Sequence, residues 1–224
     1  MKLDISYFDN AISFENGSVA VLEIENKDYF YYLVNDLIQL ENGSFVENIR
    51  FLENDGTECS HITFKVIANY FVFSFDSTKM NNYVMKQILG SIESKEKENI
   101  NKEFQKICKC FLEILGKIDL PLSFEDELNM ESFIKLLKVR IFSKNKLIDN
   151  LLLLIEISKL LENNDLLVFV NLKQYLTKEE LVELYKYSIY NEVKIFLIDS
   201  QAYGIKLDYE KKLLIDENMD EFVI

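Results

Sequence analysis

Apolar residues are distributed along this 224-residue chain in strand-like runs near both ends and at helical spacing in the middle. Continuous apolar runs are typical of strands that lie inside a sheet with both faces covered. Three such runs predict the main strands of an α/β domain, at residues 18–24, 166–170 and 193–198. Two weaker runs predict further strands at residues 61–66 and 70–75.

Helices are predicted between these strands. The first runs from residue 29 to about residue 40, and a helical pattern then extends over residues 80–115, with a break at the charged stretch 93–99. A shorter helix is expected at residues 129–138. Four residues of the long pattern repeat at helical spacing and predict one buried face: Cys108, Phe111, Leu112 and Leu115.

The last third of the chain has the clearest pattern. A helix at residues 147–162 is apolar almost all round, so we expect it to be buried against a sheet or a partner subunit. Thr177 and Glu180 form a capping box that opens another helix between the last two main strands. A strand, a helix and a strand with short connections predict a right-handed parallel crossover.

The order of the elements predicts the domain organisation. Strands and helices alternate toward both ends of the chain, whereas the middle is helical only. The helical middle is therefore expected to be an insertion in one α/β domain. We assign residues 1–78 and 139–224 to the α/β head and residues 79–138 to the insertion.

Composition limits the function. The chain is 49% hydrophobic, enough for a sizeable core, but its formal net charge of −13 counts against general nucleic-acid binding. Its three cysteines and one histidine do not supply a Cys/His zinc site. The N-terminus lacks a secretory pattern and no apolar run is long enough to span a bilayer, so we expect a cytoplasmic protein without membrane contact.

Motifs of nucleotide enzymes and hydrolases are absent. Neither G-x-x-x-x-G-K-[ST] nor G-x-G-x-x-G occurs, and the connection at residues 23–28 has carboxylates in place of glycines, so ATP hydrolysis is not expected. Ser60 lies beside His61 but not in a G-x-S-x-G elbow. Cys108 and Cys110 should point to different faces of one helix. We therefore assign no catalytic residue.

Polar residues follow two of the main strands. Asn171 comes directly after the strand at 166–170, and Asp199 and Ser200 come after the strand at 193–198. Ligands of open α/β sheets bind at the carboxyl ends of strands, so these residues could bind a ligand. Roles as turn and cap residues are the favoured interpretation.

Two charged clusters stand out from this background. Four carboxylates lie in a short segment before the helix at 129–138, and their oxygens would suit Ca²⁺ or Mg²⁺: Asp119, Glu125, Asp126 and Glu127. The alternative is a solvated acidic start of a helix. Five basic residues follow with no acid between Ser132 and Ile148, and they could neutralise phosphates: Lys135, Lys138, Arg140, Lys144 and Lys146. The alternative is a solvated face that pairs with nearby acids.

Read in order, several segments resemble the short form of the DNA-end-binding adaptation proteins of type II-A CRISPR systems. The resemblance depends on order and spacing over the whole chain, not on a catalytic signature. Its strongest stretch comprises Leu166-Leu-Val-Phe-Val-Asn171, Tyr175-Leu-Thr-Lys-Glu-Glu-Leu181 and Val193-Lys-Ile-Phe-Leu-Ile198. Earlier and later segments are Gly17-Ser-Val-Ala-Val-Leu-Glu23, Val72-Phe-Ser-Phe-Asp76, Ile118-Asp-Leu, Glu125-Asp-Glu127 and Leu214-Ile-Asp-Glu-Asn218.

The resemblance implies a fold and a function. The fold is an α/β head similar to a P-loop ATPase that has lost its nucleotide loop, with an inserted helical leg. Four chains form a ring, and calcium ions held by carboxylates position the legs. Basic side chains line a central hole that takes the end of linear double-stranded DNA. The protein acts without enzymatic activity in spacer acquisition, beside the CRISPR integrase and the RNA-guided nuclease.

One segment departs from the family pattern, and two other functions remain open. Pro121 and Leu122 stand where further acids are expected, which leaves the number of calcium ions undetermined. One alternative is a divergent nucleotide-dependent enzyme on the same α/β scaffold. The other is an acidic oligomeric interaction protein without DNA binding, whose apolar helix at 147–161 is buried against another chain.

Overall fold

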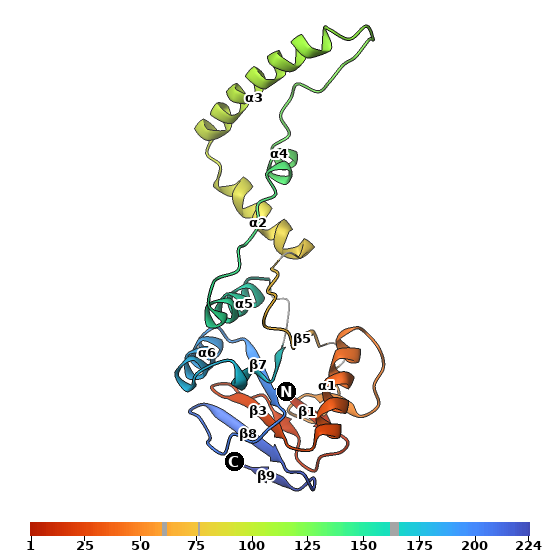
Figure 1. Ribbon diagram of the computed structural model, residues 1–224, viewed down its shortest axis with the longest axis vertical. Coiled ribbons are helices and arrows are strands. Elements are labelled where there is room, and N and C mark those ends of the chain that lie inside the picture. The colour runs from red at the N-terminus through yellow and green to blue at the C-terminus, as the bar shows by residue number, and fades with distance from the viewer. Residues whose placement is uncertain (60–61, 76, 162–165) are drawn as a thin grey trace. The chain divides into compact units, whose positions relative to one another are not determined.

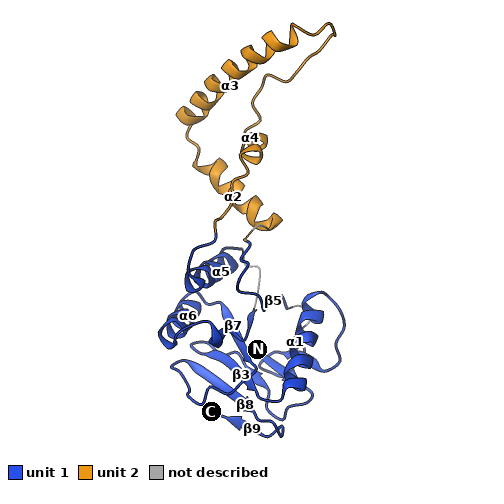
Figure 2. Ribbon diagram, viewed as in Figure 1, with its two compact units in different colours: residues 1–74, 143–224 blue, residues 75–142 orange. Residues whose placement is uncertain are grey.

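The structure, a computed structural model, describes residues 1–59, 62–75, 77–161 and 166–224. The chain forms two compact units, shown in different colours in Figure 2. We call residues 1–74 and 143–224 the head, and residues 75–142 the insertion. The boundaries expected from the sequence, after residues 78 and 138, each lie four residues inside the insertion.

A six-stranded sheet organises the head, in the order β5-β6-β7-β3-β8-β9. Its first five strands are parallel, and β9 pairs antiparallel with β8. The three predicted main strands are confirmed as β3, β6 and β7. The strands are β3 (Val19–Ile24), β5 (Phe64–Ile67), β6 (Leu166–Val170), β7 (Lys194–Asp199), β8 (Glu210–Ile215) and β9 (Glu221–Val223).

Helices and a smaller sheet cover the two faces of the large sheet (Figure 1). Alternate residues of β3, including Leu22 and Ile24, pack with Leu37 of α1 (Lys27–Glu41) and with the strands of the small sheet. The other face lies against α6 (Lys178–Tyr190), which begins at the predicted capping box of Thr177 and Glu180. The small antiparallel sheet has the order β2-β1-β4 and comprises β1 (Lys2–Ile5), β2 (Ile12–Ser13) and β4 (Ile49–Leu52).

The apolar helix of the last third is α5 (Leu147–Leu161), and it is buried within the head. Leu151 and Ile155 are fully buried, whereas Leu160 is exposed. We expected this helix to be buried against a sheet or against a partner subunit. The structure shows that the core of its own chain covers it. The apolar character of α5 consequently gives no support to a partner subunit.

The predicted strand at residues 70–75 is wrong. After β5 ends at Ile67, the chain turns and buries the ring of Tyr70. The Tyr70 hydroxyl lies 3.0 Å from the Ile67 carbonyl oxygen and 2.9 Å from that of Val170. β5 is therefore the edge strand of the sheet. The sequence pattern suggested a further strand beside it, but the described residues of this segment are held in place by the buried Tyr70 instead.

The insertion contains α2 (Thr78–Ser91), α3 (Ser94–Leu115) and α4 (Met130–Leu137). The break between α2 and α3 lies at the start of the predicted stretch, where Glu93 and Glu96 form a capping box. The buried face predicted on α3 is wrong in part: Cys108 is buried, but Phe111 and Leu112 are 47% and 56% exposed. Helices α2 and α4 pack together. On α3, Phe111 has only a partial cover from the ring of Phe124 among the described residues.

No helix among the described residues is both long and apolar enough to cross a membrane.

Candidate functional site

The connection after β3 is the place where nucleotide enzymes of this architecture hold phosphate, because free N–H groups at a helix start attract anions. Here Asn26 caps α1, and its Oδ1 accepts hydrogen bonds from the amides of Asp28 (3.2 Å) and Tyr29 (3.3 Å). Its Nδ2 donates to the Glu217 carbonyl at 3.2 Å. A side chain of the protein thus occupies the amides that a phosphate would need.

The polar residues after β6 and β7 serve mainly as turn residues. Asn171 has a left-handed backbone (φ 56°), and its Oδ1 accepts a hydrogen bond of 2.8 Å from the Ser200 amide. One carboxylate oxygen of Asp199 accepts a hydrogen bond of 3.3 Å from the Lys173 amide. The favoured interpretation as a turn and cap residue is therefore confirmed for Asn171, whereas Asp199 is the buried last residue of β7.

Four charged side chains form a buried network that includes Lys173, in the turn after β6. The Lys173 Nζ is 3.0 Å from Glu23 Oε1 and 2.8 Å from Glu210 Oε1. The Lys212 Nζ is 2.9 Å from Glu23 Oε1 and 3.8 Å from Glu210 Oε2. Each of the four residues is at most 7% exposed. Two positive and two negative charges balance, so the network needs no outside ion.

Neighbouring groups complete the hydrogen bonding of this network. The Tyr185 hydroxyl donates to Glu210 at 2.9 Å, the Tyr203 amide donates to Glu23 at 3.1 Å, and Lys212 donates to the Ile205 carbonyl at 2.8 Å. Burial alone lowers the pKa of Lys173, but the hydrogen bonds and charges of the two glutamates outweigh it, so its pKa is raised. The network is a structural clamp in which Lys173 stays charged.

Asp199 lies next to this network, and its pKa is raised well above the usual value of a carboxyl group. It is fully buried, and its Oδ2 has no hydrogen-bond partner among the described residues. Burial is the main reason that its pKa is raised to about 7; the charges of Glu23 and Glu210 act in the same direction, while Lys173 opposes them. Near neutral pH this carboxyl is consequently a mixture of its two protonation states.

The sequence itself contains a signal for this network. Glu23 interrupts an otherwise apolar strand. Lys212 lies in β8, a strand in which most residues are buried. Charged residues are almost never fully buried unless they are paired. Such interruptions indicate a buried pair, but only the strand register identifies the partners.

The predicted basic residues divide between the two units. Lys144 and Lys146 belong to the head, where Asn150 holds their backbone through hydrogen bonds of 2.6–3.1 Å. The other three belong to the insertion and line a hollow of about 290 Å³ between α2 and α4: Lys135, Lys138 and Arg140. We call this hollow the basic groove. Its apolar lining comes from Val84, Met85, Ile134 and Val139.

The acidic segment is an exposed loop of the insertion. Its four predicted metal ligands are all exposed: Asp119, Glu125, Asp126 and Glu127. Their oxygens suit calcium chemically, but across the described ranges no three acid, histidine or cysteine side chains are grouped as a metal site. The loop is tied to α3 by Gln105, which donates to the Asp126 carbonyl at 2.8 Å, and by the edge-on ring contact of Phe111 and Phe124.

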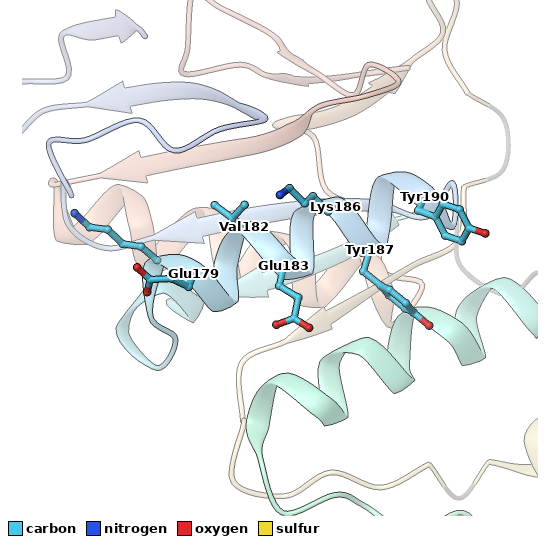
Figure 3. A pocket seen from close by; sticks show the side chains of 7 residues that line it. Glu179, Val182, Glu183, Lys186, Tyr187 and Tyr190 are labelled. Atoms are coloured by element: carbon cyan, nitrogen blue, oxygen red, sulfur yellow. The ribbon is translucent and has the colours of Figure 1, made fainter.

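Three other features complete the candidate sites. Ser60 and His61 lie outside the described residues. Cys108 is buried and Cys110 is exposed, so the expectation that they point to different faces of one helix is confirmed. The outer face of α6 borders a hollow of about 680 Å³ (Figure 3). Its lining carries both positive and negative side chains and shows no catalytic arrangement: Lys178, Glu179, Glu183, Lys186 and Tyr187.

Comparison with known proteins identifies the family. Residues 44–219 match the family described as CRISPR-associated protein (Cas_Csn2). CRISPR-associated protein Csn2 of Streptococcus agalactiae is 24% identical over 232 residues, which cover 98% of this chain and 99% of that protein. The crystal structure of Stu0660 of Streptococcus thermophilus shares the fold with a TM-score of 0.57 at 15% identity, covering all of this chain and 76% of that one. The resemblance found in the sequence is confirmed, and the chain belongs to the Cas_Csn2 family of CRISPR-associated proteins.

Proposed function

We propose that this protein binds the ends of double-stranded DNA during CRISPR spacer acquisition, without enzymatic activity and without sequence preference. The observation that carries the proposal is the basic groove, in which Lys135, Lys138 and Arg140 gather in a chain of net charge −13. Three cations in one hollow can neutralise phosphates that the remaining surface repels. Membership of the Cas_Csn2 family supports a role in CRISPR adaptation.

The head supports binding of this kind more than nucleotide chemistry. A parallel sheet with β3 in its interior favours a degenerate P-loop-like fold, and the Asn26 cap replaces the phosphate loop at the start of α1. Glu23, near the end of β3, is neutralised by Lys173 and Lys212 of the same chain. A divergent nucleotide-dependent enzyme is therefore the weaker alternative.

The negative charge requires an assembly that separates acids from DNA. In the proposed homotetrameric ring, symmetry collects the basic residues of four chains around one axis, which gives a local positive surface despite the −13 of each chain. Calcium ions bound by Asp119, Glu125, Asp126 and Glu127 would neutralise part of the remaining charge. The CRISPR integrase and the RNA-guided nuclease are the proposed partners to which the DNA passes.

A gel shift with linear and closed circular duplexes, with and without calcium, tests the proposal. A threading ring needs a free end, so linear DNA should shift and closed circles should not. The logarithm of the binding constant should fall with the logarithm of salt concentration, by about 0.9 for each phosphate contacted. Changing Lys138, Arg140 and Lys144 together to glutamate should abolish the shift.

A matched control removes the same charge elsewhere. Lys95, Lys97 and Lys109 are exposed on α3, and changing them to glutamate alters the net charge equally without touching the basic groove. This control should keep binding within about threefold of the parent, since exposed charges remote from the DNA are largely screened by salt. If the first triple variant binds as well as the parent, the DNA-binding assignment is wrong; equal binding to closed circles would exclude threading.

A further inference from the structure

Helix α3 of the insertion carries an apolar stripe with the spacing of a helix–helix seam. Phe104, Ile107, Phe111 and Ile114 follow one another at intervals of three, four and three residues, and Ile100 precedes them by four. Intervals that alternate between three and four residues keep side chains in one stripe along a helix, as at the a and d positions of coiled coils. We call these five residues the α3 seam.

The C-terminal half of the α3 seam is open in a single chain. Ile107 is 63% and Ile114 is 51% exposed. The ring of Phe111 meets that of Phe124 edge-on but also stays largely exposed. Figure 1 shows α3 apart from α2 and α4, which pack with each other. Since Cys108 on the adjacent side of α3 is buried, the described residues cover one side of this helix and leave the seam side open.

The sizes of the seam residues favour a second α3 in antiparallel orientation as the cover. Antiparallel helices pair a positions with d positions, so Ile107 meets Phe111 of the second copy and Phe104 meets Ile114 of the second copy. Every layer then combines one aromatic ring with one isoleucine. Parallel helices would stack ring on ring and isoleucine on isoleucine, and layers of unequal size pack less well. Opposed helix dipoles also favour the antiparallel pair.

Charges beside the seam agree with this orientation. Glu103 and Lys117 lie on one flank of the seam, seven residues before and after Cys110. The layers of Ile107 and Phe111 centre the contact on this part of α3, so Glu103 of each chain lies beside Lys117 of the other. Within one chain Glu103 is 2.7 Å from Lys106, but both side chains are exposed, and such a pair contributes little. Opposite charges that flank a seam set the choice and orientation of the partner.

We infer that α3 of one chain packs antiparallel against α3 of a second copy through the α3 seam. From Ile100 to Ile114 the seam is about 21 Å long at 1.5 Å per residue, which is two heptads. Helices of this length are marginal in isolation, so the contact needs the folded insertion and should be of micromolar strength. The inference rests on the proposed homotetramer and supplies one of its two-fold contacts. It requires neither DNA nor calcium.

Sedimentation velocity of the full-length protein, in chelator and without DNA, tests the apolar part of the contact. Ile107→Glu places two carboxylates in the central layers and should weaken association at least about tenfold. Leu112→Glu is the matched control, because Leu112 is 56% exposed on the same helix but lies about 140° around it from Ile107. The control should associate within about threefold of the parent. Equal helix content by circular dichroism ensures that both variants are folded.

Charge reversal tests the partner and the orientation. Glu103→Lys alone places two lysines together at each end of the contact, and Lys117→Glu alone places two glutamates together. Each single variant should associate about fivefold more weakly than the parent at low salt. The double variant has both charges exchanged and should recover to within about twofold, because opposite charges face each other again. A parallel pair would bring Glu103 beside its own copy and would not give this recovery.

Cross-linking reports on the same geometry. Cys110 is exposed and lies nearest to the two-fold axis, whereas Cys108 is buried. A short bismaleimide should therefore join two parent chains at micromolar concentration and should fail to do so after Cys110→Ser. Equal yields of covalent dimer from both proteins would contradict the antiparallel pair.

The outcomes separate this inference from the proposed function. If Ile107→Glu associates as strongly as the parent, or if the double charge variant is no better than the single ones, the α3 contact is excluded while the homotetramer stands. If the parent itself is a 26.4 kDa monomer at all concentrations, the contact and the homotetramer are both excluded. The gel shift with linear DNA is an independent measurement, and its failure would leave the α3 contact unaffected.

Discussion

The head and the insertion differ in how much of their apolar surface they bury. The head covers its sheet on both faces, and four of its buried charged side chains pair with one another. The insertion buries few side chains, among them Met80, Cys108 and Ile134, and leaves many apolar residues exposed. The comparison predicts that the head is stable by itself, whereas the insertion depends on contacts with other chains.

The largest effect should come from breaking the charge network of the head. Lys173→Ala leaves Glu23 and Glu210 buried with one lysine between them, and breaking a buried ion pair typically costs about 3–5 kcal/mol. Urea unfolding should show this loss in the free energy of unfolding. Lys186→Ala, on the exposed face of α6, is the matched control and should change stability by less than about 0.5 kcal/mol. Equal effects of the two substitutions would refute the clamp.

One leucine in each unit tests this difference in burial. Leu151 of α5 is fully buried in the head, and Leu151→Ala should cost about 3 kcal/mol through lost burial and a cavity. Leu136 of α4 is 75% exposed, so Leu136→Ala should leave the stability of dilute protein within about 0.5 kcal/mol of the parent. The same substitution should weaken self-association at high concentration. A large loss of stability for Leu136→Ala in dilute protein would contradict the proposed dependence on other chains.

A more gradual effect should appear in the pH dependence of the head. Because the pKa of Asp199 is raised to about 7, against about 3.9 unfolded, the folded state holds one more proton between these values. Stability should therefore fall as pH rises through this window, by at most about 1.4 kcal/mol per pH unit, and this contribution should level off above pH 7. Asp199→Asn keeps the oxygen that accepts from Lys173 and removes the titration.

The measurement is urea unfolding of parent and Asp199→Asn between pH 5 and pH 8. The difference in unfolding free energy, variant minus parent, should increase with pH, because only the parent must bury a developing negative charge. The groups that face Asp199 are Lys173, Glu23, Glu210, Tyr70, Tyr185 and Tyr203. A constant difference over this range would show that Asp199 keeps one protonation state.

Local signals in the sequence were sufficient for most of the head. The apolar runs predicted β3, β6 and β7, and the Thr177 capping box predicted the start of α6. These predictions succeed because burial on both faces of a parallel sheet leaves a continuous apolar run. The strand expected at residues 70–75 failed because tertiary contacts of Tyr70 outweighed its local strand preference.

Non-local pairing explains what the sequence could not supply. Glu23 and Lys212 are far apart in the chain, and only the register of β3 and β8 places their side chains on one face. The face predicted on α3 has the spacing of a buried stripe, but spacing alone does not say whether its cover belongs to the same chain. For the predicted metal and DNA-binding residues, the sequence indicates charge and chemistry, while their grouping depends on the fold and the assembly.

The charge network of the head also constrains how this protein can evolve. Loss of any one of Glu23, Lys173, Glu210 or Lys212 leaves an uncompensated charge in the interior, so a single substitution passes through an unstable intermediate. A double replacement by apolar residues avoids that state. Among natural relatives these four positions should therefore covary, changing as oppositely charged pairs or giving way together to hydrophobic residues.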